Sequence, residues 1–251
     1  MTNTLRLDDV EIKITLDKSQ VDRALQKLGL PVDRPPWLIH FCEDVTAAAG
    51  AGTPLFDLGV VLRARRKPGE PDDTTVKLRP CRRSQLTDHW LAVEKADGVE
   101  VKLEADWAGG GHKLAASCTA DRSADLVRAV GAGEQPIAAL FHDQQIAFLR
   151  ECFGSTVNLA ALTVLPPITA MRWKKSDAAP ADLKLRAERW TVDDLDFLEL
   201  SIVVPPDQAR AKQAALTGFV QSLGFTVDPM PEPKTGRVIA HLVDQVLAEA
   251  G

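Results

Sequence analysis

A charged residue stands at every second position of a β-branched run near the start of the chain, which reads Asp-Val-Glu-Ile-Lys over residues 9 to 13. Because the side chains of a strand alternate between its two faces, Asp9, Glu11 and Lys13 share one face and Val10 and Ile12 the other. One such strand is typical of a sheet edge with a solvated outer face. The run therefore predicts a strand and leaves the environment of its charges open.

The same period of two returns in later segments, so at least six strands are predicted to carry a charged face. The charged members of the later segments are Arg63 and Arg65; Lys77 and Arg79; Lys102, Glu104 and Asp106; Arg172 and Lys174; Lys184, Arg186 and Glu188; and Glu199. Bases and acids are both plentiful among them. This mixture suits a site that holds a highly charged anion together with cations.

The first four of these segments, taken in order, resemble the CYTH superfamily, the triphosphate tunnel metalloenzymes. Asp9-x-Glu11-x-Lys13 is similar to the ExExK motif of that family. An Arg-x-Arg strand at 62–65, a turn, and the segment Thr75–Pro80 follow in the family's order, and then comes a basic-x-acidic-x-acidic strand from Lys102 to Asp106.

The resemblance spans roughly residues 8 to 204 and implies an α+β fold: an antiparallel, closed or nearly closed β-barrel, charged inside, with helices packed outside. It also implies hydrolysis or rearrangement of a triphosphate compound with a divalent metal. Two positions depart from the family's pattern. Asp9 replaces the usual first Glu, and Ser201 stands where the last strand often has a second acid after Glu199.

Local patterns predict the helices and one hairpin. A helix is expected after Asp17 as N-cap and before Gly29, and turn residues at 69–73 predict a hairpin between the two Arg- and Lys-bearing strands. Further helices are predicted over 134–153, 207–223 and 235–248. Because no linker rich in Gly, Pro or Ser separates parts of the chain, residues 1–251 are expected to form a single CYTH-like domain.

Composition limits the classes of function and the location. The chain has 251 residues, a net charge of −5 and a pI of about 5.6, which argues against binding nucleic acid or anionic membranes through a basic surface. The apolar runs are far shorter than the ~20 residues of a membrane span, and the first residues lack an apolar signal segment. A cytoplasmic protein is therefore expected.

The four cysteines lie far apart without a Cys-x-x-Cys pair, so buried thiols are expected rather than a zinc site or a redox pair. They are Cys42, Cys81, Cys118 and Cys152.

The resemblance assigns candidate roles to the charged positions. Arg forks and Lys point charges both suit phosphate oxygens, and carboxylates are the hard ligands that Mg²⁺ or Mn²⁺ prefer. The expected phosphate contacts are Arg63, Arg65, Lys77, Arg79, Lys102, Arg172, Lys174, Lys184 and Arg186, and the expected metal ligands are Asp9, Glu11, Glu104, Asp106, Glu188 and Glu199. Glu11, Lys13 and Glu104 are the expected catalytic residues.

The function expected on this basis is metal-dependent hydrolysis of inorganic triphosphate, thiamine triphosphate or a nucleoside triphosphate. An adenylate cyclase of the same superfamily and a non-catalytic polyphosphate-binding module remain the alternatives. No nucleic-acid or membrane partner is expected, and the oligomeric state is open.

Overall fold

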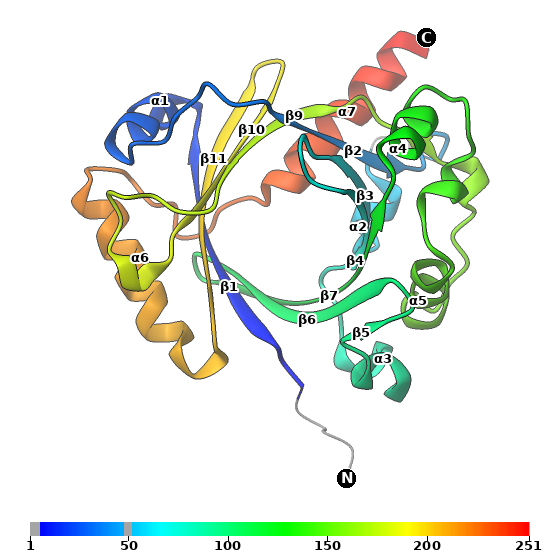
Figure 1. The fold of residues 1–251 in the computed structure, drawn as a ribbon, viewed down its shortest axis with the longest axis horizontal. Coiled ribbons are helices and arrows are strands. Elements are labelled where there is room, and N and C mark those ends of the chain that lie inside the picture. Colours follow the sequence, from blue (N-terminus) through cyan, green and yellow to red (C-terminus); the bar gives the residue numbers. More distant parts are fainter. Residues whose placement is uncertain (1–5, 48–51, 251) are drawn as a thin grey trace.

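The computed structural model describes residues 6–47 and 52–250, and within these residues nine strands close into a ring (Figure 1). In spatial order the ring consists of β1 (Asp9–Asp17), β11 (Leu195–Val204), β10 (Arg186–Val192), β9 (Ile168–Trp173), β2 (Trp37–Glu43), β3 (Val60–Arg66), β4 (Asp72–Leu78), β7 (Gly111–Arg122) and β6 (Val99–Ala108). Two short strands, β5 (Lys95–Ala96) and β8 (Thr163–Val164), extend β6 and β2. The predicted α+β barrel is confirmed.

The ring closes through a parallel pairing of β1 with β6, which places Asp9 opposite Glu104 and Glu11 opposite Asp106. Every other neighbouring pair in the ring is antiparallel. A ring with an odd number of strands cannot alternate direction all the way around, so one pairing must be parallel. The prediction of a purely antiparallel barrel is wrong at this one seam.

The outer face of the barrel is apolar and is covered by helices. On one side Val10, Ile12 and Leu200 pack with α1 (Lys18–Lys27) and α6 (Ala209–Ser222). On the other side Leu62 and Leu103 belong to a cluster shared with α3 (Asp88–Ala92), α4 (Ala124–Gly131) and α5 (Asp143–Phe153). Because strand side chains alternate, this packing leaves the charged positions facing the interior.

The last helix, α7 (Lys234–Ala250), covers one end of the barrel rather than its outer wall (Figure 1). Its residues Val238 and Leu242 share a buried cluster with Phe41, Trp190 and Phe197. The inner wall is apolar at this end, which gives the apolar face of α7 a surface to bury. The expectation that all helices pack outside the barrel therefore does not hold for α7.

Most predicted elements lie where the patterns place them. Asp17 precedes α1, Gly69 adopts a positive φ in the β3–β4 turn, and Gly224 ends α6 with a φ of 78°. The prediction of a single helix over 134–153 is wrong, because this segment contains two elements. It divides into a 3-10 turn, η2 (Ile137–Leu140), and α5, because His142 and Gln145 form a capping box that starts a new helix.

The remaining short helical elements are α2 (Pro54–Asp57), η1 (Arg83–Gln85), η3 (Leu159–Ala161), η4 (Ala181–Leu183) and η5 (Pro206–Gln208). No helix in the described part of the chain has the length and hydropathy needed to cross a membrane. The four cysteines are buried free thiols, as expected. The first five residues, where no signal segment was expected, lie outside the described residues.

Candidate active site

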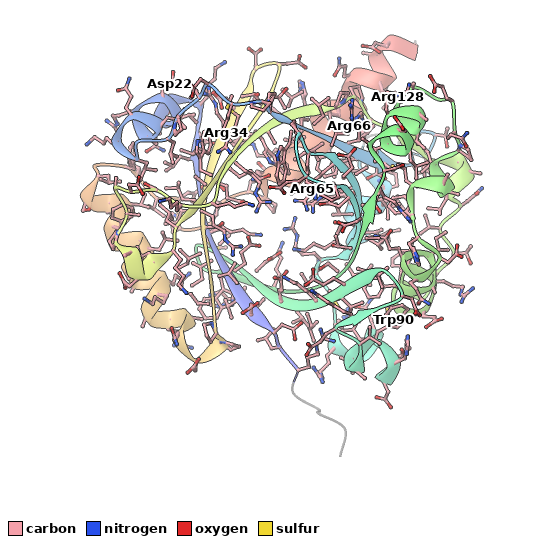
Figure 2. The ribbon with its side chains drawn as sticks, in the orientation of Figure 1. Asp22, Arg34, Arg65, Arg66, Trp90 and Arg128 are labelled. Atoms are coloured by element: carbon pink, nitrogen blue, oxygen red, sulfur yellow. The ribbon has the colours of Figure 1, made fainter. Side chains whose placement is uncertain are left out.

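The barrel encloses a cavity of about 300 Å³ whose wall is dominated by charged side chains from seven of the ring strands and from α7. Its cations are Lys13, Arg63, Arg65, Lys77, Arg79, Lys102, Arg172, Arg186 and Lys234, and its carboxylates are Glu11, Glu100, Glu104, Glu188 and Glu199. Arg65 points into the ring from β3 (Figure 2). The excess of cations makes the cavity suited to an anion.

Seven of the nine expected phosphate contacts line this cavity, but Lys174 and Lys184 do not. Strand β9 ends at Trp173, so Lys174 is exposed and pairs with Glu70 at 3.2 Å. Lys184 is exposed, with a φ of 47°, and precedes the first residue of β10. The alternation of charged residues predicted that both lysines face inward. This prediction is wrong because neither residue belongs to a strand.

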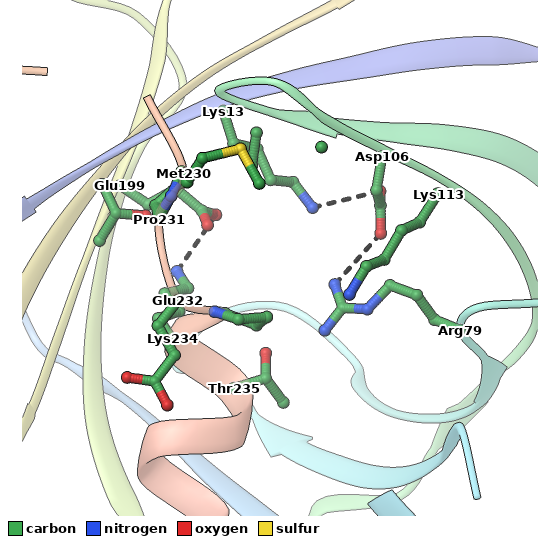
Figure 3. A pocket seen from close by; sticks show the side chains of 14 residues that line it. Lys13, Arg79, Asp106, Lys113, Glu199, Met230, Pro231, Glu232, Lys234 and Thr235 are labelled. Atoms are coloured by element: carbon green, nitrogen blue, oxygen red, sulfur yellow. Dashed lines mark hydrogen bonds and ion pairs between the residues drawn. The ribbon is translucent and has the colours of Figure 1, made fainter. Parts of the chain in front are cut away.

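The carboxylate of Asp106 forms ion pairs with three of the cations. Its carboxylate lies 3.3 Å from Lys13 and 3.1 Å from both Lys77 and Arg79 (Figure 3 draws its contacts with Lys13 and Arg79). Burial favours the neutral acid, but the three cations outweigh burial and hold the pKa of Asp106 well below its usual range. Asp106 therefore positions cations, although it was expected to bind metal.

Lys13 is held between two carboxylates, with Nζ 2.7 Å from Glu11 and 3.3 Å from Asp106. Burial favours the neutral amine, yet Glu11 and Asp106 raise the pKa of Lys13 well above its usual value. Lys13 is therefore a permanent cation at neutral pH. It can bind a phosphate oxygen but cannot accept a proton.

Glu104 is the carboxylate whose charge is least compensated. Burial and the negative charges of Glu11 and Asp106 raise the pKa of Glu104. Lys77 and Lys102 lower this pKa, but their effect is the smaller one. Glu11 and Glu104 are neighbouring carboxylates whose negative charges repel each other. A cation between them would relieve this repulsion, so the two residues fit a divalent metal ion.

No group of three or more His, Cys, Asp or Glu residues in the described ranges is arranged to hold a metal ion. This still fits Mg²⁺, which typically uses one or two carboxylates together with water and substrate phosphates. Of the other expected ligands, Asp9 and Asp106 lie opposite Glu104 and Glu11 in the β1–β6 ladder, and Asp106 already contacts three cations. Glu188 accepts a hydrogen bond from Trp190 Nε1 at 2.9 Å, and Asp9 shares the inward face of β1 without lining the cavity.

Three arginines are held at the end of the cavity away from α7. Arg63 donates to Thr75 Oγ1 at 3.2 Å while its buried Nε has no partner, and burial together with Arg65 lowers the pKa of Arg63 to about 9. Arg65 pairs with Asp73, and the guanidinium carbons of Arg65 and Arg172 lie 5.4 and 5.0 Å from the centre of the Trp37 ring. This set of incompletely paired cations favours an anionic ligand.

Lys234 is a site residue that the strand pattern does not reveal. It enters the cavity from the first turn of α7, where Nζ lies 3.1 Å from Glu199 and 4.0 Å from the centre of the Trp190 ring. The sequence predicted a helix start near this position. Only the packing of α7 across the barrel end places the lysine among strand residues.

No family model matches this sequence, and no curated protein matches it. Solved structures do share its fold. A candidate adenylate cyclase from Bacillus halodurans matches with a TM-score of 0.57 at 12% identity, covering 92% of this chain and 97% of that protein. A candidate adenylyl cyclase from Hippeastrum, described as having a dominant triphosphatase activity, matches with a TM-score of 0.56 at 13% identity, covering 90% and 93%.

These two structures match nearly the full length of the chain, and the barrel interior brings together charged residues of the four segments quoted above. The chain therefore shares the fold of these two structures, a closed barrel with a charged interior.

Proposed function

We propose that this protein hydrolyses the terminal phosphoanhydride bond of a triphosphate compound in the barrel cavity, with Mg²⁺ or Mn²⁺ bound by Glu11 and Glu104. The observation that carries the proposal is the cavity itself, in which nine cations face five carboxylates inside a closed barrel. A triphosphate chain with a divalent ion matches both the excess of positive charge and the neighbouring carboxylates of Glu11 and Glu104.

The cations have the geometry for phosphate binding. Arg63, Arg65 and Arg172 offer planar forks that bind two phosphate oxygens at once, whereas Lys13 and Lys77 offer point charges. Together they would hold the phosphate chain in place for attack and stabilise the charge on its oxygens. A metal ion at Glu11 and Glu104 would supply further neutralisation of the phosphate oxygens.

In the proposed reaction a water oxygen attacks the terminal phosphorus, and the bond to the bridging oxygen breaks. The electron pair stays on the bridging oxygen, so the products are orthophosphate and the diphosphate compound. Lys13 cannot take the water proton, because Glu11 and Asp106 keep it protonated. A divalent ion on Glu104 would lower the pKa of that carboxylate, so the water proton would pass to a phosphate oxygen of the products or to solvent.

A second candidate is cyclisation of ATP, because both similar structures are described as candidate adenylate cyclases. Cyclisation would require the ribose 3′-hydroxyl beside the α-phosphate, and it would release diphosphate instead of orthophosphate. Product analysis separates the two reactions without ambiguity.

The test is to incubate the protein with inorganic triphosphate, thiamine triphosphate or ATP, with Mg²⁺, with Mn²⁺ or with EDTA, and to measure orthophosphate, diphosphate and cyclic AMP. We expect metal-dependent release of orthophosphate from at least one substrate. Cyclic AMP as the main product would establish the cyclase. Binding without any turnover would leave only a polyphosphate-binding module, and the proposal would be wrong.

A further inference from the structure

A second chamber of about 190 Å³ adjoins the main cavity, and Figure 3 shows the side chains that line it. Lys13, Arg79, Glu199 and Lys234 line both spaces, whereas Asp106 lines the second chamber. These side chains lie at the border of the two spaces, where Asp106 contacts Lys13 and Arg79, and Lys234 contacts Glu199.

The chamber is bounded by a proline-rich strap, defined here as residues 229–233, which leads into α7. The strap is seated on the turn between β6 and β7, where Gly110 N donates to the carbonyl oxygen of Pro229 at 2.7 Å. A Cβ atom at Gly109 would lie 2.2 Å from that oxygen, and the φ of Gly109 is +55°. Glycine at this turn is therefore what allows the strap to approach so closely.

The chamber carries a cation that the main cavity does not use. Lys113 stands opposite Asp106 across the β6–β7 ladder, and no ion pair among the described residues holds it. Asp106 is already surrounded by three cations. With Lys13, Arg79 and Lys234 the chamber has four cations against three carboxylates, Asp106, Glu199 and Glu232. This slight excess suits a small anion held weakly.

The arrangement of the two adjoining spaces determines where each reaction product would lie. Because α7 and its first turn occupy the deep end, a compound entering from the arginine end would place its terminal phosphate deepest, near Lys13 and Arg79. After hydrolysis the diphosphate product would lie between the new orthophosphate and the entrance. A site for orthophosphate on the far side would remove it from the reacting position.

We propose that this second chamber is a binding site for orthophosphate, with Lys113 as its dedicated cation, so that the two products occupy separate sites. The assignment of orthophosphate as product rests on the proposed function. Anion binding in the chamber is a separate property, which is measurable without turnover.

The test is calorimetric titration of orthophosphate in the absence of divalent ions, with the main cavity saturated by methylenediphosphonate, a non-hydrolysable diphosphate. The variants are Lys113→Glu, which reverses an exposed charge, and Lys27→Glu as matched control. Lys27 is an exposed lysine of α1 that donates to the carbonyl oxygen of Leu223 at 2.8 Å, outside the barrel.

We expect the saturated wild-type protein to bind one orthophosphate, Lys113→Glu to weaken that binding about fivefold or more through local repulsion, and Lys27→Glu to leave it within about twofold. Methylenediphosphonate binding should be nearly the same in all three proteins. If the saturated protein binds no orthophosphate, or if Lys113→Glu binds it like wild type, the second site does not exist. Because no turnover is measured, this result is independent of whether the substrate panel is hydrolysed.

Discussion

Lys234 Nζ lies 3.1 Å from Glu199, although the lysine belongs to the first turn of the last helix and the glutamate to the middle of a barrel strand. Both side chains are nearly buried, with 6% and 13% exposed. The pair therefore links the helix that covers the barrel end to the wall of the cavity.

Lys234→Met should destabilise the protein, because it leaves Glu199 buried and without its cation. Removing one partner of a buried pair typically costs about 3–5 kcal/mol, and slightly less is expected here because Glu199 is partly exposed. Urea denaturation measures the loss. The double variant Lys234→Met with Glu199→Gln should recover most of it, and an additive double variant would show that the pair is not coupled.

Glu11→Gln and Arg65→Ala should separate metal binding from phosphate binding. The amide keeps the shape of Glu11 but loses its charge, so metal-dependent turnover should fall by about 10²-fold or more while substrate binding is largely kept. Arg65→Ala should mainly raise KM, because phosphate charge is left unpaired. Steady-state kinetics check both, with Lys174→Ala as an exposed control; equally mild effects would contradict the proposed site.

Asp106→Asn should destabilise the protein in a pH-dependent way. The folded-state pKa of Asp106 is depressed, so its ionisation stabilises the fold above the unfolded-state pKa of about 3.9, and that contribution is lost as the pH falls below this value. The difference in melting temperature between wild type and Asp106→Asn should therefore be large at pH 7 and shrink toward pH 3. A difference independent of pH would show that the charge of Asp106 is not what matters.

Ser201→Glu should lower the metal concentration that gives half-maximal rate. Ser201 shares the inward face of β11 with Glu199 and Val203 and lies opposite Lys13 and Arg186 in the adjacent strands. An added carboxylate there raises the affinity for a hard cation, and in the wild type Mn²⁺ should support activity better than Mg²⁺. An unchanged or higher metal requirement would mean that the site does not use this position.

Inorganic triphosphate should raise the melting temperature of the free protein, because a ligand that binds only the folded state stabilises it by mass action. At 100 times Kd the gain is about 2.7 kcal/mol, or roughly 5–10 °C for a chain of this size. Differential scanning fluorimetry measures the shift. Arg63→Ala should reduce it, and no shift at saturating ligand in the wild type would exclude binding in the cavity.

The sequence by itself determined the barrel and most of its inner wall. The period of two in β1, β3, β4 and β6 places most charges on one face and most apolar residues on the other, and this depends only on strand geometry. Helices can then cover only the apolar face, so the charges converge inside. The two expected phosphate contacts that do not line the cavity, Lys174 and Lys184, lie beyond strand ends, which local patterns locate poorly.

The tertiary structure decided which charges meet and how the barrel is closed. The parallel β1–β6 seam brings Lys13 against Asp106, a contact between residues far apart in the chain that no local pattern contains. It is this contact that makes Asp106 a partner of cations rather than a free carboxylate. The placement of α7 across the barrel end, and with it Lys234 and the second chamber, follows from an apolar patch on the inner wall that forms only when β2, β3, β10 and β11 curl together, so it exists only in the folded protein.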